Sequence, residues 1–208
     1  MVRQVKWWAL VSSAAAPVVL IGGWTLAAQR QPDGFDSTVD TISALAARNA
    51  TDRWLMTAAL LCVGICHVVT ASGLSRAAPA GRIIFGLGGV ATMLVALFPS
   101  PTTGSAPEHA VSAGIAFAAL AVWPAFAWRR RDSTPPAAQP FALRPIASFT
   151  AALVLLWLVA WFTVTLGTGG PVGLAERLAA GAQACWPFAA ALSSRLASYS
   201  TARGTARM

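Results

Sequence analysis

The sequence predicts an all-α fold: a polytopic transmembrane six-helix bundle with a short amphipathic helix at the membrane interface in the first outer loop. Its 208 residues are 56% hydrophobic and only 11% charged, whereas soluble chains average about 25% charged residues. The apolar residues form runs of about twenty, the length that crosses ~30 Å of hydrocarbon at ~1.5 Å per residue. None of the runs alternates as barrel strands do, and lipid cannot satisfy open backbone groups, so we expect helices. These features exclude a soluble enzyme, a disulfide scaffold and a disordered chain.

The first three runs have clear boundaries. The first follows Arg3 and Lys6 and is longer than the ~7–15-residue apolar core of a signal peptide, so we expect an uncleaved helix. The second starts at Trp54, an aromatic residue of the kind that concentrates at membrane interfaces. The third stops at Pro99 and Pro101, because proline cannot continue a helix.

The last three runs complete a single domain over residues 1–208. The fourth opens with Ser105-Ala-Pro-Glu108, a capping-box pattern. The fifth is the most apolar stretch of the chain, and the sixth contains Pro187. The predicted spans are residues 7–28, 54–74, 83–98, 108–128, 146–166 and 174–196, with an outer loop at 29–53 and a cytoplasmic linker at 129–145.

The distribution of charge predicts the orientation. With both termini inside, eleven of the fifteen Lys and Arg residues lie on the inner side, including the run 129–131. This asymmetry follows the positive-inside rule and predicts a multi-pass protein of the cell (plasma) membrane with cytoplasmic termini. It also explains the net charge of +8 without nucleic acid, since no aromatic residues interleave with the basic ones. Six of the seven carboxylates fall on the outer side: Asp33, Asp36, Asp40, Asp52, Glu108 and Glu176.

The first outer loop is the most informative region for function. Val39, Ile42 and Leu45 recur at roughly helical spacing, which predicts a short amphipathic helix at the outer interface or over the bundle mouth. Asp36 or Ser37 would cap its start and Asp40 would lie in its first turn. One interpretation makes Asp40 part of a structural cap. The other places a partly desolvated Asp40 carboxyl in a polar pocket, as a proton donor or a site for a cationic group.

Other outer residues complete the candidate site. Glu108 is a helix cap or a partner of the acid, and His109 is an interfacial ring or a base. Arg53 is expected to pair with Asp36, Asp40 or a lipid phosphate. We therefore take Asp40, His109 and Glu108 as candidate catalytic residues. The candidate substrate-binding residues are Asp36, Arg53, Trp24, Trp54, Trp157, Trp161 and Trp186, because aromatic residues can line a cavity for an isoprenoid-like ligand.

No metal or other cofactor is expected. Cys62, Cys66 and His67 lie mid-membrane on one predicted helix, but the chain has no second pair of ligands. An odd number of cysteines inside apolar runs also gives no disulfide framework. His67 should find a partner inside the bundle, and Thr92 and Gln183 are candidates.

Four motifs resemble one family in their order and spacing. They are Ser37-x-x-Asp-Thr-Ile-Ser-Ala-Leu-Ala-Ala, Asp52-Arg-Trp-Leu-Met, Leu97-Phe-Pro and Glu108-His-x-x-Ser-Ala-Gly. Together they resemble the bacterial six-helix membrane family called domain of unknown function 998, over roughly residues 10–170 and most closely over 36–118. The family often carries an acidic residue shortly after the Phe-Pro, where this chain has Pro101 and no acid before Glu108. A distant similarity of the family to lipid-linked multi-span proteins implies lipid-related work.

Three functions remain open at this point. The first is an enzyme that handles a lipid or isoprenoid in a pocket open to the outer face, such as a metal-independent, acid-initiated terpene-type cyclase or isomerase using Asp40. The second is a non-catalytic lipid-binding or assembly partner. The third is a small transporter, although the chain lacks paired broken helices and a mid-membrane carboxylate. The expected partner is a membrane lipid or isoprenoid small molecule, no nucleic acid is expected, and a homo-oligomer remains open.

Overall fold

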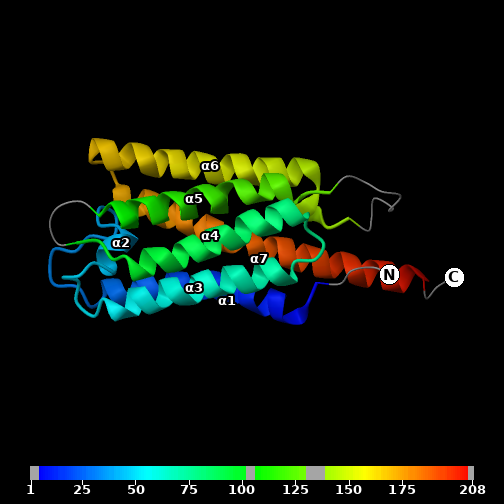
Figure 1. The fold of residues 1–208 in the computed structure, drawn as a ribbon, viewed down its shortest axis with the longest axis horizontal. Coiled ribbons are helices and arrows are strands. Elements are labelled where there is room, and N and C mark those ends of the chain that lie inside the picture. Colours follow the sequence, from blue (N-terminus) through cyan, green and yellow to red (C-terminus); the bar gives the residue numbers. More distant parts are fainter. Residues whose placement is uncertain (1–4, 102–105, 130–138, 206–208) are drawn as a thin grey trace.

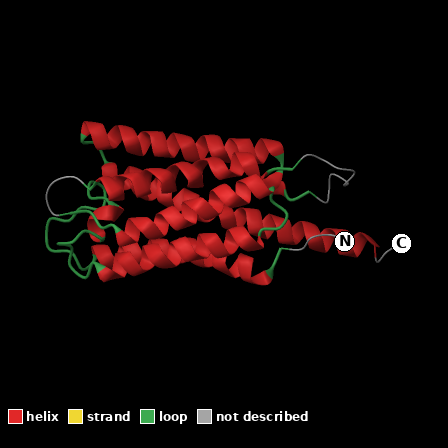
Figure 2. Cartoon of the chain, viewed as in Figure 1, coloured by secondary structure: helices red, strands yellow, loops and turns green. Residues whose placement is uncertain are grey.

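The computed structural model describes residues 5–101, 106–129 and 139–205, apart from the side chains of 199–205. Within these ranges the chain forms seven α-helices and one 3-10 helix and no strand (Figure 2). The predicted all-α class is therefore confirmed. The elements are α1 (Trp7–Ala28), α2 (Ile42–Leu45), α3 (Trp54–Gly73), α4 (Pro79–Leu97), α5 (Pro107–Ala127), η2 (Phe141–Leu143), α6 (Pro145–Thr168) and α7 (Val172–Thr205).

The six long helices run side by side (Figure 1), and the contacts between them close into a ring. Each packs against the next in the order α1, α3, α4, α5, α6, α7, and α7 returns to α1. Helix α1 begins and α7 ends at the same end of the bundle, which we name the inner end. The short helix α2 lies at the opposite end, which we name the outer end.

Five of the long helices have the length and hydropathy needed to cross a membrane: α1, α3, α4, α5 and α6. Helix α7 is not among them, so the predicted count of six spans is not confirmed. The bundle surface is apolar, with Val18 71% and Trp157 65% exposed. Large apolar side chains exposed along several helices are what a lipid-facing surface requires.

Two helix ends differ clearly from the predicted spans, and the predicted linker differs as well. Helix α4 begins at Pro79, ahead of the predicted start, because proline fits the first turn of a helix. Helix α7 continues to Thr205, beyond the predicted end at 196. The predicted cytoplasmic linker contains η2, and its residues 130–138 lie outside the described ranges.

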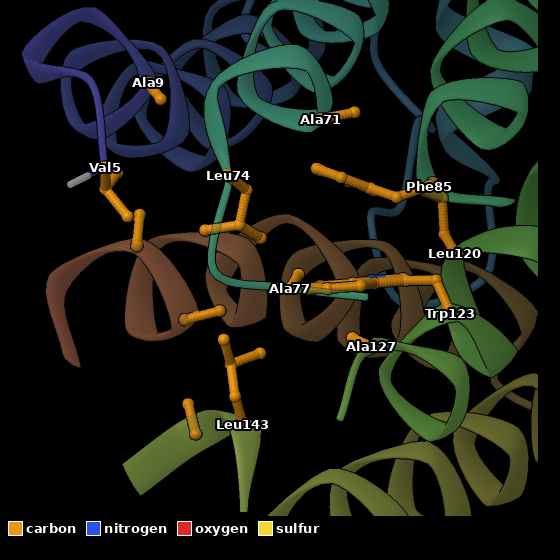
Figure 3. Packing of buried hydrophobic residues seen from close by; sticks show 13 residues of the cluster. Val5, Ala9, Ala71, Leu74, Ala77, Phe85, Leu120, Trp123, Ala127 and Leu143 are labelled. Atoms are coloured by element: carbon orange, nitrogen blue, oxygen red, sulfur yellow. The ribbon is translucent and has the colours of Figure 1, made fainter. Parts of the chain in front are cut away.

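The inner half of the bundle has its own core. Trp123 of α5 is fully buried and stacks on Phe85 of α4, with ring centroids 4.7 Å apart (Figure 3). His67 of α3 lies against the other side of Phe85, at a centroid distance of 5.1 Å. Offset aromatic stacking adds to the free energy of burial, so this cluster fixes how α3, α4 and α5 pack.

The outer half has a second core that includes α2. Ile42 and Leu45 are 4% and 0% exposed and pack with Leu20, Met56 and their neighbours. The predicted amphipathic interfacial helix is not confirmed, because α2 is a single buried turn. Its N-cap is Thr41, whose side chain accepts from the Ala44 N–H at 3.0 Å. Asp36 and Ser37 therefore do not cap it, and Asp40 precedes it. The loop is tucked into the bundle mouth.

Candidate functional site

The segment that closes the outer end is held on helix α7. We name residues 36–45 the cap segment. The backbone N–H groups of Gly173 and Leu174 donate to the carbonyls of Val39 and Thr38, at 3.2 and 2.9 Å. This approach requires glycine at 173, because a Cβ there would overlap the carbonyl oxygens of Asp40 and Ser37.

The side chain of Arg177 also binds the cap segment. Its Nη1 donates to the carbonyls of Ser37 and Asp40, both at 2.7 Å, and to Gly173 at 3.0 Å. Burial lowers the pKa of Arg177, against the attraction of Glu176, Asp40 and Asp36. Within the described residues its Nη2 is buried without a hydrogen-bond partner.

Glu176 is a buried carboxyl group beneath the cap segment. It lies in the second turn of α7, level with α2, and is only 4% exposed. Its Oε2 accepts from the Ile42 N–H at 2.5 Å, and its Oε1 lies 3.4 Å from the Ser43 hydroxyl. Burial raises the pKa of Glu176 to about 7, against the opposing effects of the Ile42 N–H, the Arg177 guanidinium and Ser43. A carboxyl group with such a pKa can donate and recover a proton near neutral pH.

Ser43 joins Glu176 to His109. The Nε2 atom of His109 lies 3.2 Å from Ser43 Oγ, and its Nδ1 lies 2.8 Å from the carbonyl oxygen of Phe98. A carbonyl only accepts, so the Phe98 contact assigns a hydrogen to Nδ1. Nε2 then either accepts from the Ser43 hydroxyl or, in the imidazolium form, donates to it.

The three side chains therefore have two complete hydrogen-bonding arrangements. In one, neutral Glu176 donates to Ser43 and Ser43 donates to neutral His109. In the other, protonated His109 donates to Ser43 and Ser43 donates to ionised Glu176. The two differ by one proton moved from Glu176 to His109 through the Ser43 hydroxyl. We name these three side chains, Glu176, Ser43 and His109, the relay.

The relay lies between a cavity beneath the cap segment and a pocket at the outer end of the bundle. The cavity has a volume of about 70 Å³ and extends from Ser43 and Glu176 down to His67, Thr92 and Gln183. That space is large enough for a few water molecules. The outer pocket, of about 160 Å³, is lined by His109 together with Glu108, Arg48 and Phe98. His109 thus lies between the outer surface and Ser43.

The deep polar residues share this cavity without bonding to His67. Thr92 donates to the carbonyl of Gly88 and Gln183 donates to that of Phe117, each at 2.9 Å. Among the described residues, Nδ1 of His67 is buried with no partner. No group of three or more His, Cys, Asp or Glu side chains that could hold a metal ion occurs within the described ranges.

The structure places Asp40 and Asp36 beside the cavity rather than in it. The Asp40 carboxylate accepts from the backbone N–H of Asp36 at 2.8 Å, and that of Asp36 accepts from the N–H of Thr38 at 2.8 Å. Glu108 is exposed in the first turn of α5. Arg53 is half-buried at the start of α3, and no ion pair joins it to Asp36 or Asp40 in the described part of the chain.

The tryptophans do not converge on one site. Trp24 packs against the outer core, while Trp54 is 63% exposed at the start of α3. Trp157 and Trp161 stack on α6, at a centroid distance of 6.1 Å. Trp186 packs against the inner core. None of these five side chains lines the cavity beneath the cap segment.

Sequence reasoning missed Ser43, Glu176 and Arg177 as members of the site. Ser43 was visible in the loop motif, and Glu176 is the only acid in the sixth apolar run. Their meeting depends on residues more than 130 positions apart in the chain, and no local pattern predicts that contact.

Comparison with known proteins identifies one family. The family model described as protein of unknown function (DUF998) matches residues 13–193. Neither the search of curated proteins nor the search of solved structures found a match.

Proposed function

We propose that this chain, which belongs to the DUF998 family, is a multi-pass membrane protein that transfers a proton to a lipid or isoprenoid substrate at its outer mouth. One observation carries the proposal: the buried carboxyl of Glu176 is joined through Ser43 to His109 at the outer pocket. A titratable group withdrawn from water and supplied by a proton relay is the arrangement that general acids use.

The membrane topology is part of the proposal. The stretch 178–196 of α7 adds a sixth crossing to the five apolar helices. It begins after Arg177, so Glu176 lies at the level of the outer membrane interface, buried beneath the cap segment. At ~1.5 Å per residue this stretch covers about 28 Å, close to the hydrocarbon thickness. Arg76, Arg82, Arg129 and Arg144 then lie with both termini on the cytoplasmic side of the cell membrane.

The proposed chemistry is proton transfer at a carbon atom. The π electrons of a substrate double bond take the proton from Glu176, which leaves a carbocation on the substrate and a carboxylate on Glu176. Loss of a neighbouring C–H proton to the carboxylate gives the isomerised product and restores the acid. Where that proton is lost to water instead, His109 resupplies Glu176 through Ser43. The reaction class is that of a metal-independent isomerase.

Glu176 takes the role for which the sequence suggested Asp40. The Asp40 carboxylate is engaged by a neighbouring backbone N–H and does not line the cavity. Glu176 lines the cavity beneath two apolar cap-segment residues, Ile42 and Leu45. Because about 70 Å³ is too small for a lipid, we infer that the cap segment moves aside when a substrate enters.

An isotope experiment tests the function and reveals the substrate in the same measurement. Proteoliposomes containing the protein and lipids extracted from its host cells are incubated in D2O, and the lipids are analysed by mass spectrometry. Protonation at carbon places deuterium on the substrate. We expect a lipid species that gains carbon-bound deuterium with the wild-type protein and not with Glu176→Gln.

The matched control is Asp40→Asn, which changes a carboxylate of the same loop outside the cavity and should keep the incorporation. Equal incorporation in empty vesicles, or in Glu176→Gln, would refute the proposed chemistry. A lipid retained without exchange would favour the binding or assembly role. Proton flux across the vesicle membrane would favour the transporter.

A further inference from the structure

A second, much larger hollow lies at the inner end of the bundle. This groove has a volume of about 1120 Å³ and is bordered by the end of α5, by η2, by α6 and by α7. This volume is slightly above the ~300–1,000 Å³ of small-molecule sites. It lies at the opposite end of the bundle from Glu176, which is not among its lining residues. We name it the inner groove.

Small side chains on two neighbouring helices make the groove hollow. Ala147 and Ala151 of α6 line it opposite Ala182 and Ala189 of α7. The rest of its lining is mostly apolar and includes Ile146, Val154, Leu155, Trp128, Phe141 and Trp186. An apolar channel between two helices on a lipid-facing surface suits a hydrocarbon chain.

The length of the groove matches one leaflet of a bilayer. Its lining on α6 runs from Pro145 to Leu155, which is about 15 Å of helix at ~1.5 Å per residue. That is half of the ~30 Å hydrocarbon thickness. An acyl chain of a lipid in the leaflet at the inner end would therefore fit along it.

Two arginines at one end of the groove indicate which lipid headgroup it would bind. Arg129 follows α5 and Arg144 precedes α6, and both line the groove. The guanidinium of Arg129 donates to the carbonyl of Ala77, whereas that of Arg144 lies over the Phe141 ring at 5.9 Å. Within the described part of the chain, no Asp or Glu lines the groove. Two arginine side chains at one end of an apolar groove attract a phosphate group.

We propose that the inner groove binds an anionic phospholipid. Its acyl chain lies between α6 and α7, and its phosphate contacts Arg144 and Arg129. Trp128 and Phe141 lie at the level of the headgroup, where aromatic residues concentrate at membrane interfaces. The site is independent of the relay at the outer end, so either proposal can fail while the other holds.

Lipid titration of the purified full chain tests the proposal. Phosphatidylglycerol and phosphatidylcholine are added separately to the protein in detergent, and bound lipid is counted by native mass spectrometry alongside the thermal unfolding midpoint. We expect phosphatidylglycerol to bind more tightly and to raise the midpoint. Arg144→Gln should weaken phosphatidylglycerol about fivefold, the factor for one arginine at a membrane surface, and weaken phosphatidylcholine less, because its choline cation cancels the charge of its phosphate. The control Arg30→Gln, an exposed arginine at the outer end, should change neither.

A second variant tests the acyl-chain position. Ala189→Phe fills the groove from a position on α7 that lines it and should weaken both lipids, while circular dichroism confirms the helical content. Equal binding of the two lipids by the wild-type protein, with no effect of Arg144→Gln, would overturn the proposal. An equal rise of the unfolding midpoint with inorganic phosphate alone would also overturn it. So would a lipid-free dimer that Ala189→Phe dissociates, because the groove would then be an interface between two copies of the chain.

Discussion

Replacing Glu176 by glutamine should remove one specific dependence of stability on pH. Glutamine keeps an oxygen that can accept from the Ile42 N–H, but it carries no titrating proton. The pKa of Glu176 is raised from 4.5 to about 7 in the folded protein. The difference of about 2.5 units at ~1.36 kcal/mol each corresponds to ~3 kcal/mol.

The sign follows from proton binding. Between pH 4.5 and about 7 the folded protein holds a proton on Glu176 that the unfolded chain has released. The free energy of unfolding contributed by this group therefore falls as pH rises through that window, and it is constant above it. Because Glu176 is 4% exposed, solvent screening reduces this figure little.

The assay is unfolding of the purified protein in mixed micelles at pH 4.5 and pH 8. The other carboxylates titrate in both proteins, so the difference between Glu176→Gln and wild type isolates Glu176. Relative to wild type, the free energy of unfolding of Glu176→Gln should be ~3 kcal/mol higher at pH 8 than at pH 4.5. Asp40→Asn should show no such shift. A difference that is the same at both pH values would refute the burial argument.

Three further predictions concern the cap segment, the relay and the core. Gly173→Ala should push the cap segment off α7 and reduce the free energy of their contact by ~1–3 kcal/mol. Amide exchange over residues 36–45 should then be faster, and unchanged exchange would contradict the close approach. Ser43→Ala should slow deuterium incorporation at least ~100-fold and His109→Gln should also slow it, whereas undiminished rates would mean that protons reach Glu176 by another route. Trp123→Ala should lower stability by ~3–5 kcal/mol, and the 65% exposed Trp157 should tolerate alanine within ~1 kcal/mol; similar losses would argue against an inner core centred on Trp123.

The long helices were predictable because each depends on local sequence. A run of apolar residues about as long as the bilayer is thick must form its hydrogen bonds internally, and the first run became α1 with the bounds Trp7–Ala28. Proline and glycine marked several ends, such as Pro107 at the start of α5 and Gly169, with φ 71°, after α6. These signals act over a few residues and need no tertiary information.

The mouth was less predictable because short polar residues have competing local partners. The spacing of Val39, Ile42 and Leu45 suggested a longer helix, but Asp36 and Asp40 bond to nearby backbone N–H groups and hold residues 36–40 in a turn. Thr41 then caps the single helical turn.

The buried acid could not be identified for a different reason. Glu176 is buried because the cap segment folds onto α7, and that contact depends on the missing side chain of Gly173. The outer loops contributed His109 and Asp40 as candidates by residue type alone. Only the tertiary fold distinguishes the buried carboxyl of Glu176 from the Asp40 carboxylate, which lies outside the cavity and accepts from a backbone N–H.

Infrared titration of the carboxyl groups tests the central claim most directly, because a protonated carboxyl has a C=O stretch that a carboxylate lacks. The wild-type protein should show one such band that disappears with a midpoint near pH 7, that is absent in Glu176→Gln and that persists in Asp40→Asn. The lack of any carboxyl band with a midpoint near pH 7, or such a band that survives in Glu176→Gln, would contradict the account.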